Sequence, residues 1–197
     1  KRADTITLTR PEVSASVPSR SCTDDAKKPV MNLANLLLDS AERYPDAPAL
    51  ARGREIVATY AQHAERSSRL AGALLDLPGI DPGDRIAIAM QNAPEYSEIM
   101  FAAWHAGLAV VPMNARLHPR EFAYILDNAG AGVCFVSDDL ADGISEVFDD
   151  VDSLEHLILA GSSRYEEMMS ADAIAAAEVN GDERAWLFYT SGTTGRP

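Results

Sequence analysis

The chain has 197 residues, of which 47% are hydrophobic and 7% aromatic, a composition typical of a globular protein rather than a disordered chain. Its formal net charge is −13, so it offers no basic field to a phosphate backbone and no nucleic-acid partner is expected. No apolar stretch approaches the roughly 20 residues that a transmembrane helix needs, and none is predicted.

Residues 1–30 are rich in Ser, Thr, Pro and charged residues and show no hydrophobic periodicity. We therefore expect a flexible leader over 1–30. It lacks the apolar region of a secretory signal peptide, and its acidic residues argue against a transit peptide. Ordered structure is expected from Met31, which gives a second unit over 31–197.

From residue 31 onward the hydrophobic pattern predicts alternating helices and strands. Thr59 followed by Gln62 is a capping-box pattern that opens one of the helices. Helices are expected at 33–44, 59–77, 92–107 and 119–129, with a weaker one at 144–148. Two short strands are expected around Gly53, followed by strands at 85–90, 108–113, 132–137, 155–161 and 185–190.

The strands after residue 84 are apolar throughout and are separated by helices. This pattern predicts the α/β class, with a mostly parallel sheet covered by helices on both faces. Ligands of such sheets bind beyond the carboxyl ends of the strands, and residue 190 follows the last predicted strand. Cys134 lies in a strand and is expected to be a buried free thiol, as in a protein of the reducing cytoplasm.

The chain finishes on "YTSGTTGRP", in which six consecutive small residues follow an apolar run. Glycines allow the backbone to approach a ligand closely, while hydroxyls and successive backbone N–H groups can bind an anion. The candidate phosphate-binding residues are Thr190, Ser191, Gly192, Thr193, Thr194 and Gly195. The alternative is an ordinary surface turn. The spacing fits neither GxxxxGK[ST] nor the dinucleotide pattern GxGxxG.

The same nine residues resemble the phosphate-binding signature of the adenylate-forming enzymes, YTSGTTGxPKG. Eight specified positions match, and Arg196 occupies the variable one. The preceding stretch that begins "PGDRIAIAMQNAPEY" is also similar to this family, and "VVPMNARLHPREF" resembles its acyl-CoA synthetase branch. The resemblance implies that the chain is part of the large N-terminal domain of such an enzyme.

What the resemblance implies is an AMP-forming acid–CoA ligase of the fatty-acid type, which uses ATP, Mg²⁺ and CoA. A carboxylic acid would react with ATP to give an acyl-adenylate and pyrophosphate, and CoA would then give the thioester. Thr190 to Gly195 would hold the β- and γ-phosphates. The alternatives are an aryl or amino-acid adenylating enzyme, or a non-catalytic truncated interaction module.

In this family the signature continues with Lys-Gly, and the adenine, metal and acyl-pocket motifs come later. These motifs would lie beyond residue 197, and Lys28 is the last lysine of the chain. No catalytic residue and no metal ligand are therefore assigned within the 197 residues. We expect the 197 residues alone to lack ligase activity and to bind ATP weakly, which calorimetry would test.

Other conspicuous residues are interpreted as structural. The histidines show no metal-ligand spacing. Trp104 and Trp186 are expected in the core. The residues expected on solvated surfaces are Arg116, Arg120, Asp149, Asp150, Asp152, Glu166 and Glu167.

Overall fold

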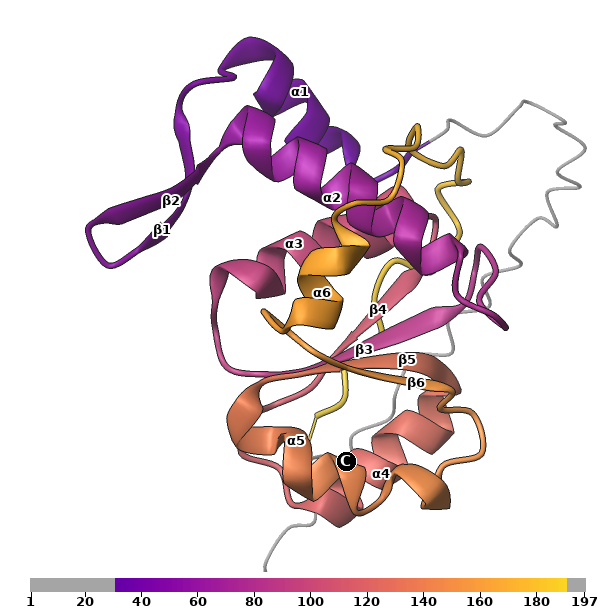
Figure 1. The fold of residues 1–197 in the computed structure, drawn as a ribbon. Helices are drawn as coiled ribbons and strands as arrows, with labels where there is room; N and C mark the ends of the chain where they lie inside the picture. The colour runs from indigo at the N-terminus through magenta and orange to yellow at the C-terminus, as the bar shows by residue number, and fades with distance from the viewer. Residues whose placement is uncertain (1–30, 191–197) are drawn as a thin grey trace, which may run out of the picture.

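Four parallel strands form the central sheet of the part of the chain that the computed structural model describes, residues 31–190 (Figure 1). They lie in the order β4-β3-β5-β6, and each strand is joined to the next in sequence through a helix. Their bounds are Arg85–Ala89 for β3, Ala109–Pro112 for β4, Ala131–Val136 for β5 and His156–Leu159 for β6. The predicted parallel α/β architecture is confirmed.

The register of the sheet aligns apolar residues from neighbouring strands. Ile86 pairs with Val110 on one side and with Val133 on the other. All the side chains of β3 after Arg85 are fully buried, because helices cover both faces of this central strand. Continuous apolar runs of this kind are what a doubly covered parallel sheet requires.

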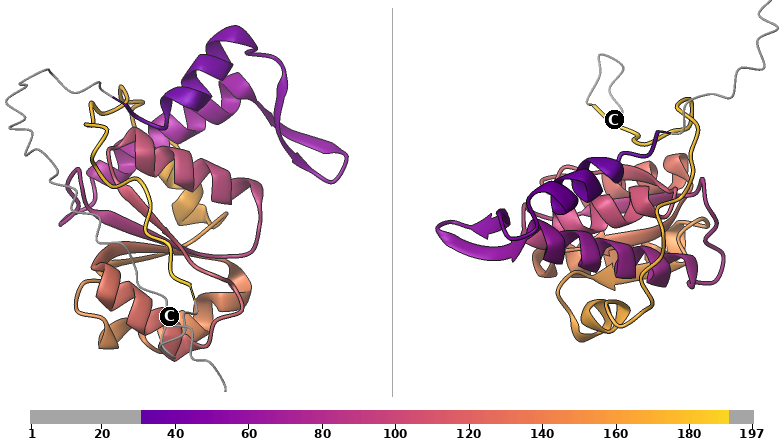
Figure 2. Two further views of the ribbon diagram at one scale, coloured as in Figure 1. Left: turned by 180° about the vertical axis from the view of Figure 1, so that it is seen from behind. Right: turned by 90° about the horizontal axis from the view of Figure 1, so that it is seen from above.

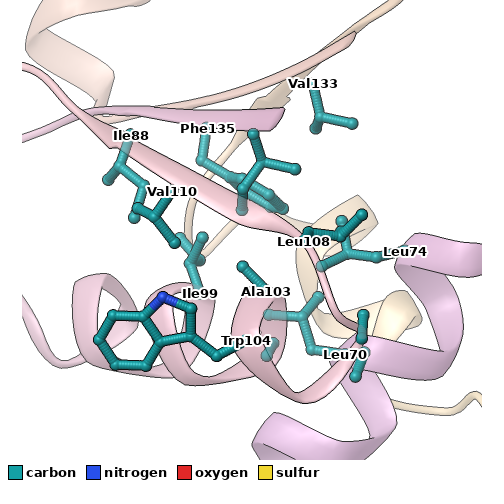
Figure 3. Close-up of a cluster of buried hydrophobic side chains, with 14 of the residues drawn as sticks. Leu70, Leu74, Ile88, Ile99, Ala103, Trp104, Leu108, Val110, Val133 and Phe135 are labelled. Atoms are coloured by element: carbon teal, nitrogen blue, oxygen red, sulfur yellow. The ribbon is translucent and has the colours of Figure 1, made fainter. Parts of the chain in front are cut away.

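One face of the sheet packs against α2 (Tyr60–Leu75), α3 (Pro94–His105) and α6 (Ser163–Met168). The cluster in Figure 3 joins Leu70 and Leu74 of α2 and Ile99 of α3 to Ile88 and Phe135 of the sheet. Each of these five side chains is fully buried. This face therefore holds the larger core.

The opposite face packs against α4 (Pro119–Ala129) and α5 (Asp138–Ser145), with a short 3₁₀ turn at Phe148–Asp150. These elements lie below the sheet in Figure 1. Helix α4 has the bounds predicted for it, because Pro119 occupies its first position and Gly130 closes it with a φ of 62°. Helix α5 begins six residues before the predicted 144, at Asp138.

The N-terminal elements extend away from the sheet (Figure 2). Helix α1 (Asn35–Arg43) packs on α2, and the antiparallel hairpin of β1 (Pro48–Arg52) and β2 (Glu55–Thr59) precedes that helix. Both capping-box hydrogen bonds predicted between Thr59 and Gln62 are present, at 2.9 and 3.3 Å. No helix within residues 31–190 is long and apolar enough to cross a membrane.

Candidate functional site

The segment over residues 185–190, which leads to the candidate loop, runs beside β4 at the edge of the sheet. Val110 donates its N–H to the Ala185 carbonyl, and Leu187 donates to the Val110 carbonyl, both at 2.9 Å. Trp186 and Val110 form a single parallel bridge. The predicted strand is therefore wrong in extent, because the segment makes one bridge rather than a ladder.

A proline explains why the ladder stops. The next hydrogen bond of a parallel ladder would run from the N–H of residue 112 to the carbonyl of Leu187. Residue 112 is a proline and has no N–H to donate. The segment then leaves the sheet edge, passing from the layer of α3 to that of α4, as the yellow ribbon shows in Figures 1 and 2.

On the α3 side the segment is held by Trp104, which is 5% exposed and belongs to the core as predicted. Its indole N–H donates to the Ala185 carbonyl at 3.0 Å, and its ring meets Trp186 edge to face at 4.8 Å between centroids. Trp186 itself remains 41% exposed and Phe188 68% exposed. The prediction that Trp186 is a core residue was wrong, because the residue lies at the sheet edge and a large part of it stays exposed.

On the α4 side the segment contributes Leu187 and Tyr189, which are partly buried against the smaller core cluster. The Tyr189 hydroxyl donates to Oδ1 of Asn128 at 2.7 Å. Partial burial, with a smaller contribution from Tyr124, raises the pKa of Tyr189, so the hydroxyl stays protonated and able to donate. Side chains thus alternate between two helix layers, as in a strand, although the backbone ladder has ended.

Thr190 is exposed and is the last residue that the structure describes. The other candidate phosphate-binding residues, Ser191 to Gly195, lie outside the described residues, as does the leader predicted over 1–30. The assignment of the phosphate loop therefore stays a prediction. What the structure adds is the route by which the chain reaches Thr190.

Three polar side chains, those of Gln91, Ser137 and Asp139, meet at the carboxyl ends of β3 and β5. The sequence analysis predicted no site there. Asp139 accepts hydrogen bonds from the Ser137 hydroxyl at 2.6 Å and from the Gln91 amide at 2.7 Å. These two hydrogen bonds lower the pKa of Asp139, and the bond from Ser137 has the larger effect. The signal in the sequence was "SDD" directly after a buried strand, a pattern typical of a helix start at a ligand-binding edge.

Sequence reasoning also missed a buried ionic cluster under α6. Glu98 of α3 is 4% exposed, forms an ion pair with Arg66 of α2 and accepts the Tyr165 hydroxyl at 2.9 Å. Arg66 reaches Glu166 as well, at 3.2 Å, and Glu166 is exposed as predicted, as is Glu167. The two glutamates raise the pKa of Arg66. The cluster links three helices, which is a structural role.

The remaining candidates give no further site. The predicted surface residues Arg116, Arg120, Asp149, Asp150 and Asp152 are all exposed. Within residues 31–190 no three His, Cys, Asp or Glu side chains are grouped so as to hold a metal ion. Cys134 is fully buried as predicted, and burial raises the pKa of its thiol to about 12.

A cavity of about 530 Å³ lies at the other end of the strands. It is lined by Arg85 and Leu108, next to the amino ends of β3 and β4, and by residues 31–33 and 179–185. Because ligands of parallel sheets bind at the carboxyl ends, this cavity is separate from the expected loop site.

Comparison with known proteins defines the class. The family model described as AMP-binding enzyme matches residues 37–197, and the chain belongs to this family. The chain is 34% identical over 142 residues to the long-chain-fatty-acid–CoA ligase FadD13 of Mycobacterium tuberculosis, covering 71% of this chain and 28% of that protein. It is 32% identical over 157 residues to a feruloyl-CoA synthase of Amycolatopsis, covering 80% of this chain and 30% of that protein.

A solved structure agrees with this assignment. The inhibitor-bound N-terminal domain of FACL13 from Mycobacterium tuberculosis superimposes with a TM-score of 0.76 at 33% sequence identity. The match covers 84% of this chain and 42% of that domain. The fold is therefore that of the N-terminal part of an adenylate-forming enzyme. The chain spans less than a third of the length of either curated relative described above.

Proposed function

We propose that the full-length protein containing this chain is a cytoplasmic, AMP-forming acyl-CoA synthetase that acts on fatty acids. The observation that carries the proposal is the signature "YTSGTTGRP", which follows a segment hydrogen-bonded alongside β4 of an α/β sheet. Membership of the AMP-binding enzyme family and the similarity to FadD13 support it.

In the first step a carboxylate oxygen of the fatty acid would attack the α-phosphorus of ATP. The bond between the α-phosphorus and the bridging oxygen to the β-phosphorus breaks, and pyrophosphate leaves. In the second step the CoA thiolate attacks the acyl carbon, AMP leaves, and a thioester is formed. Negative charge accumulates on the phosphoryl oxygens in the first step, so stabilisation by hydrogen-bond donors is the main requirement there.

The residues from Thr190 to Gly195 would supply these donors to the β- and γ-phosphates. Hydroxyls and consecutive backbone N–H groups suit a polyphosphate, and glycines permit close approach. Mg²⁺ would bind with the nucleotide phosphates and neutralise part of their charge. No protein ligand of the metal is proposed from residues 31–190.

Pyrophosphate exchange tests the proposal. The purified full-length protein should exchange labelled pyrophosphate into ATP when a long-chain fatty acid is present, and release AMP when CoA is added. Thr193→Ala should lower kcat/KM for ATP by about tenfold or more, as removal of a preorganised donor does. Absence of exchange with every carboxylic acid tested would contradict an adenylate-forming activity.

An aryl acid is the second candidate substrate, and the similarity to feruloyl-CoA synthase favours it over an amino acid. The same exchange assay distinguishes the classes when fatty, aryl and amino acids are compared at equal concentration. A preference of more than tenfold in kcat/KM for one class would identify the substrate.

A further inference from the structure

We propose that Asn128 is a positioning residue: its hydrogen bond to Tyr189 holds the end of segment 185–190, at the point where the predicted phosphate-binding loop begins. This inference rests on the proposed function and deepens it. Tyr189 immediately precedes the loop, and its hydroxyl lies 2.7 Å from Oδ1 of Asn128. The geometry assigns to α4 a role in placing the ATP phosphates, although α4 carries no residue of the signature.

The need for such a tether follows from where the sheet hydrogen bonds stop. Leu187 is the last described residue of the segment to bond β4, because Pro112 has no N–H to continue the ladder. In the described part of the chain no backbone hydrogen bond holds residues 188–190. Residues beyond the last ladder hydrogen bond are not held in one orientation by the sheet. The hydrogen bond of the Tyr189 side chain is then the contact nearest to the loop that can hold them.

Helix α4 is a rigid anchor for that fixed point. His118 and Glu121 cap its first turn with reciprocal hydrogen bonds. At its other end, Arg85 of β3 donates to the carbonyls of Ala129 and Gly130, both at 2.8 Å. Asn128 lies in this last turn of α4, so the tether connects Tyr189 to a helix end that is itself bound to the central strand.

The α3 side supplies the opposing contact. Trp104 holds the Ala185 carbonyl and the Trp186 ring from the other layer. The segment is therefore held on the α3 side at its start and on the α4 side at its end. Two anchors on opposite faces define a direction, whereas one would leave the segment free to rotate about it.

Two substitutions test the pair in the full-length protein. Tyr189→Phe removes the donor and Asn128→Leu removes the acceptor at similar volume. Each should raise the KM for ATP in pyrophosphate exchange by about fivefold, the effect of one hydrogen bond, and leave the KM for the carboxylic acid within twofold. Because both remove the same hydrogen bond, the double variant should be no worse than either single variant.

A stability control separates positioning from general damage. Thr59→Ala removes the N-cap of α2, far along the chain from the loop. It should lower the thermal midpoint of unfolding by about as much as the two tether variants do, without changing the KM for ATP. Hydrogen exchange gives a readout independent of activity: the Leu187 amide, which is hydrogen-bonded to the Val110 carbonyl, should exchange faster in both tether variants and at the wild-type rate in Thr59→Ala.

The possible outcomes are distinct. If the wild type is active but both tether variants keep its KM for ATP, the positioning role is wrong while the proposed function stands. Effects that multiply in the double variant, or that fall equally on both substrates, would also overturn it. If the wild type shows no exchange activity, the proposed function fails and this inference fails with it, whatever the amide exchange shows.

Discussion

The indole N–H of Trp104 donates to the carbonyl of Ala185 across 3.0 Å, and this hydrogen bond joins a helix of the larger core to the segment that leads to the loop. The same carbonyl also accepts the N–H of Val110. A buried side chain of α3 thus holds the segment at the residue where it meets the sheet.

We predict that Trp104→Phe destabilises the protein by about 1–2 kcal/mol, through the lost hydrogen bond and the smaller ring. The Leu187 amide donates the next hydrogen bond along the segment, to the Val110 carbonyl. This amide should exchange faster in Trp104→Phe than in the wild type. Phe101→Leu is the control, because Phe101 packs edge to face on Trp104 at 5.2 Å but has no polar side-chain atom to hydrogen-bond Ala185. It should cost similar stability. Equal exchange of the Leu187 amide in the two variants would contradict the prediction.

A second prediction concerns the buried carboxylate of Glu98. Glu98→Gln removes the charge that faces Arg66 and places an amide where the Tyr165 hydroxyl donates. Because Glu98 is only 4% exposed, we expect urea denaturation to show a loss of about 2–3 kcal/mol. Glu166→Gln removes the other partner of Arg66, which is 52% exposed, and should cost less than about 1 kcal/mol. A larger loss of stability in Glu166→Gln than in Glu98→Gln would show that the buried Arg66–Glu98 pair is not the stronger of the two.

The features that sequence could predict are those with local signals. Pro119 and Gly130 mark both ends of α4, and the Thr59–Gln62 pair marks the start of α2. Helix α5 was placed too late because its first turn is acidic and has little apolar periodicity. The last predicted strand was shortened by a property of its partner, the missing N–H of Pro112, which a search along the segment itself cannot reveal.

The candidate site divides in the same way. The composition of the loop was recognisable from nine contiguous residues, whereas its anchors come from positions far away in sequence. Asn128 lies 61 residues before Tyr189, and Trp104 lies 81 residues before Ala185. Neither carries a pattern of its own, since one is an exposed helical amide and the other a core aromatic residue. Only the fold brings them to segment 185–190.

A third prediction follows from the burial of His63, which is 2% exposed and hydrogen-bonded to Ser97 at 3.0 Å. Burial, and secondarily the charge of Arg66, lowers its pKa from 6.5 to about 4. Between these two values the unfolded chain binds a proton that the folded protein does not. The free energy of unfolding should therefore fall as pH drops below about 6.5, by up to about 3 kcal/mol at pH 4.

The measurement compares wild type with His63→Gln by urea denaturation between pH 4.5 and 7.5. The variant should lose part of the stability at neutral pH but show a shallower decline on acidification. His105, whose pKa is also lowered by burial, is present in both proteins and cancels from the difference. Parallel curves would mean that His63 is not the group responsible.

The last prediction concerns Gly72, in the last turn of α2. Residues 171–174 lie against this helix, held by the Arg69 guanidinium on the Ala171 carbonyl at 3.0 Å and by the Ile174 N–H on the Ser68 carbonyl at 3.4 Å. A Cβ at position 72 would lie 2.5 Å from the Asp172 carbonyl oxygen. That atom belongs to the backbone, so the whole segment would have to move.

Gly72→Ala should therefore destabilise the protein by about 1–2 kcal/mol, although alanine is favoured over glycine in a helix by about 1 kcal/mol. Gly143→Ala in α5 is the matched control, because the nearest atom to its new Cβ would be a ring carbon of Pro119 at 3.3 Å. A side-chain neighbour can shift by a few tenths of an ångström, so we expect this variant to be neutral or slightly stabilised. If Gly72→Ala were as stable as Gly143→Ala, segment 171–174 would not be packed against α2 as closely as the structure shows.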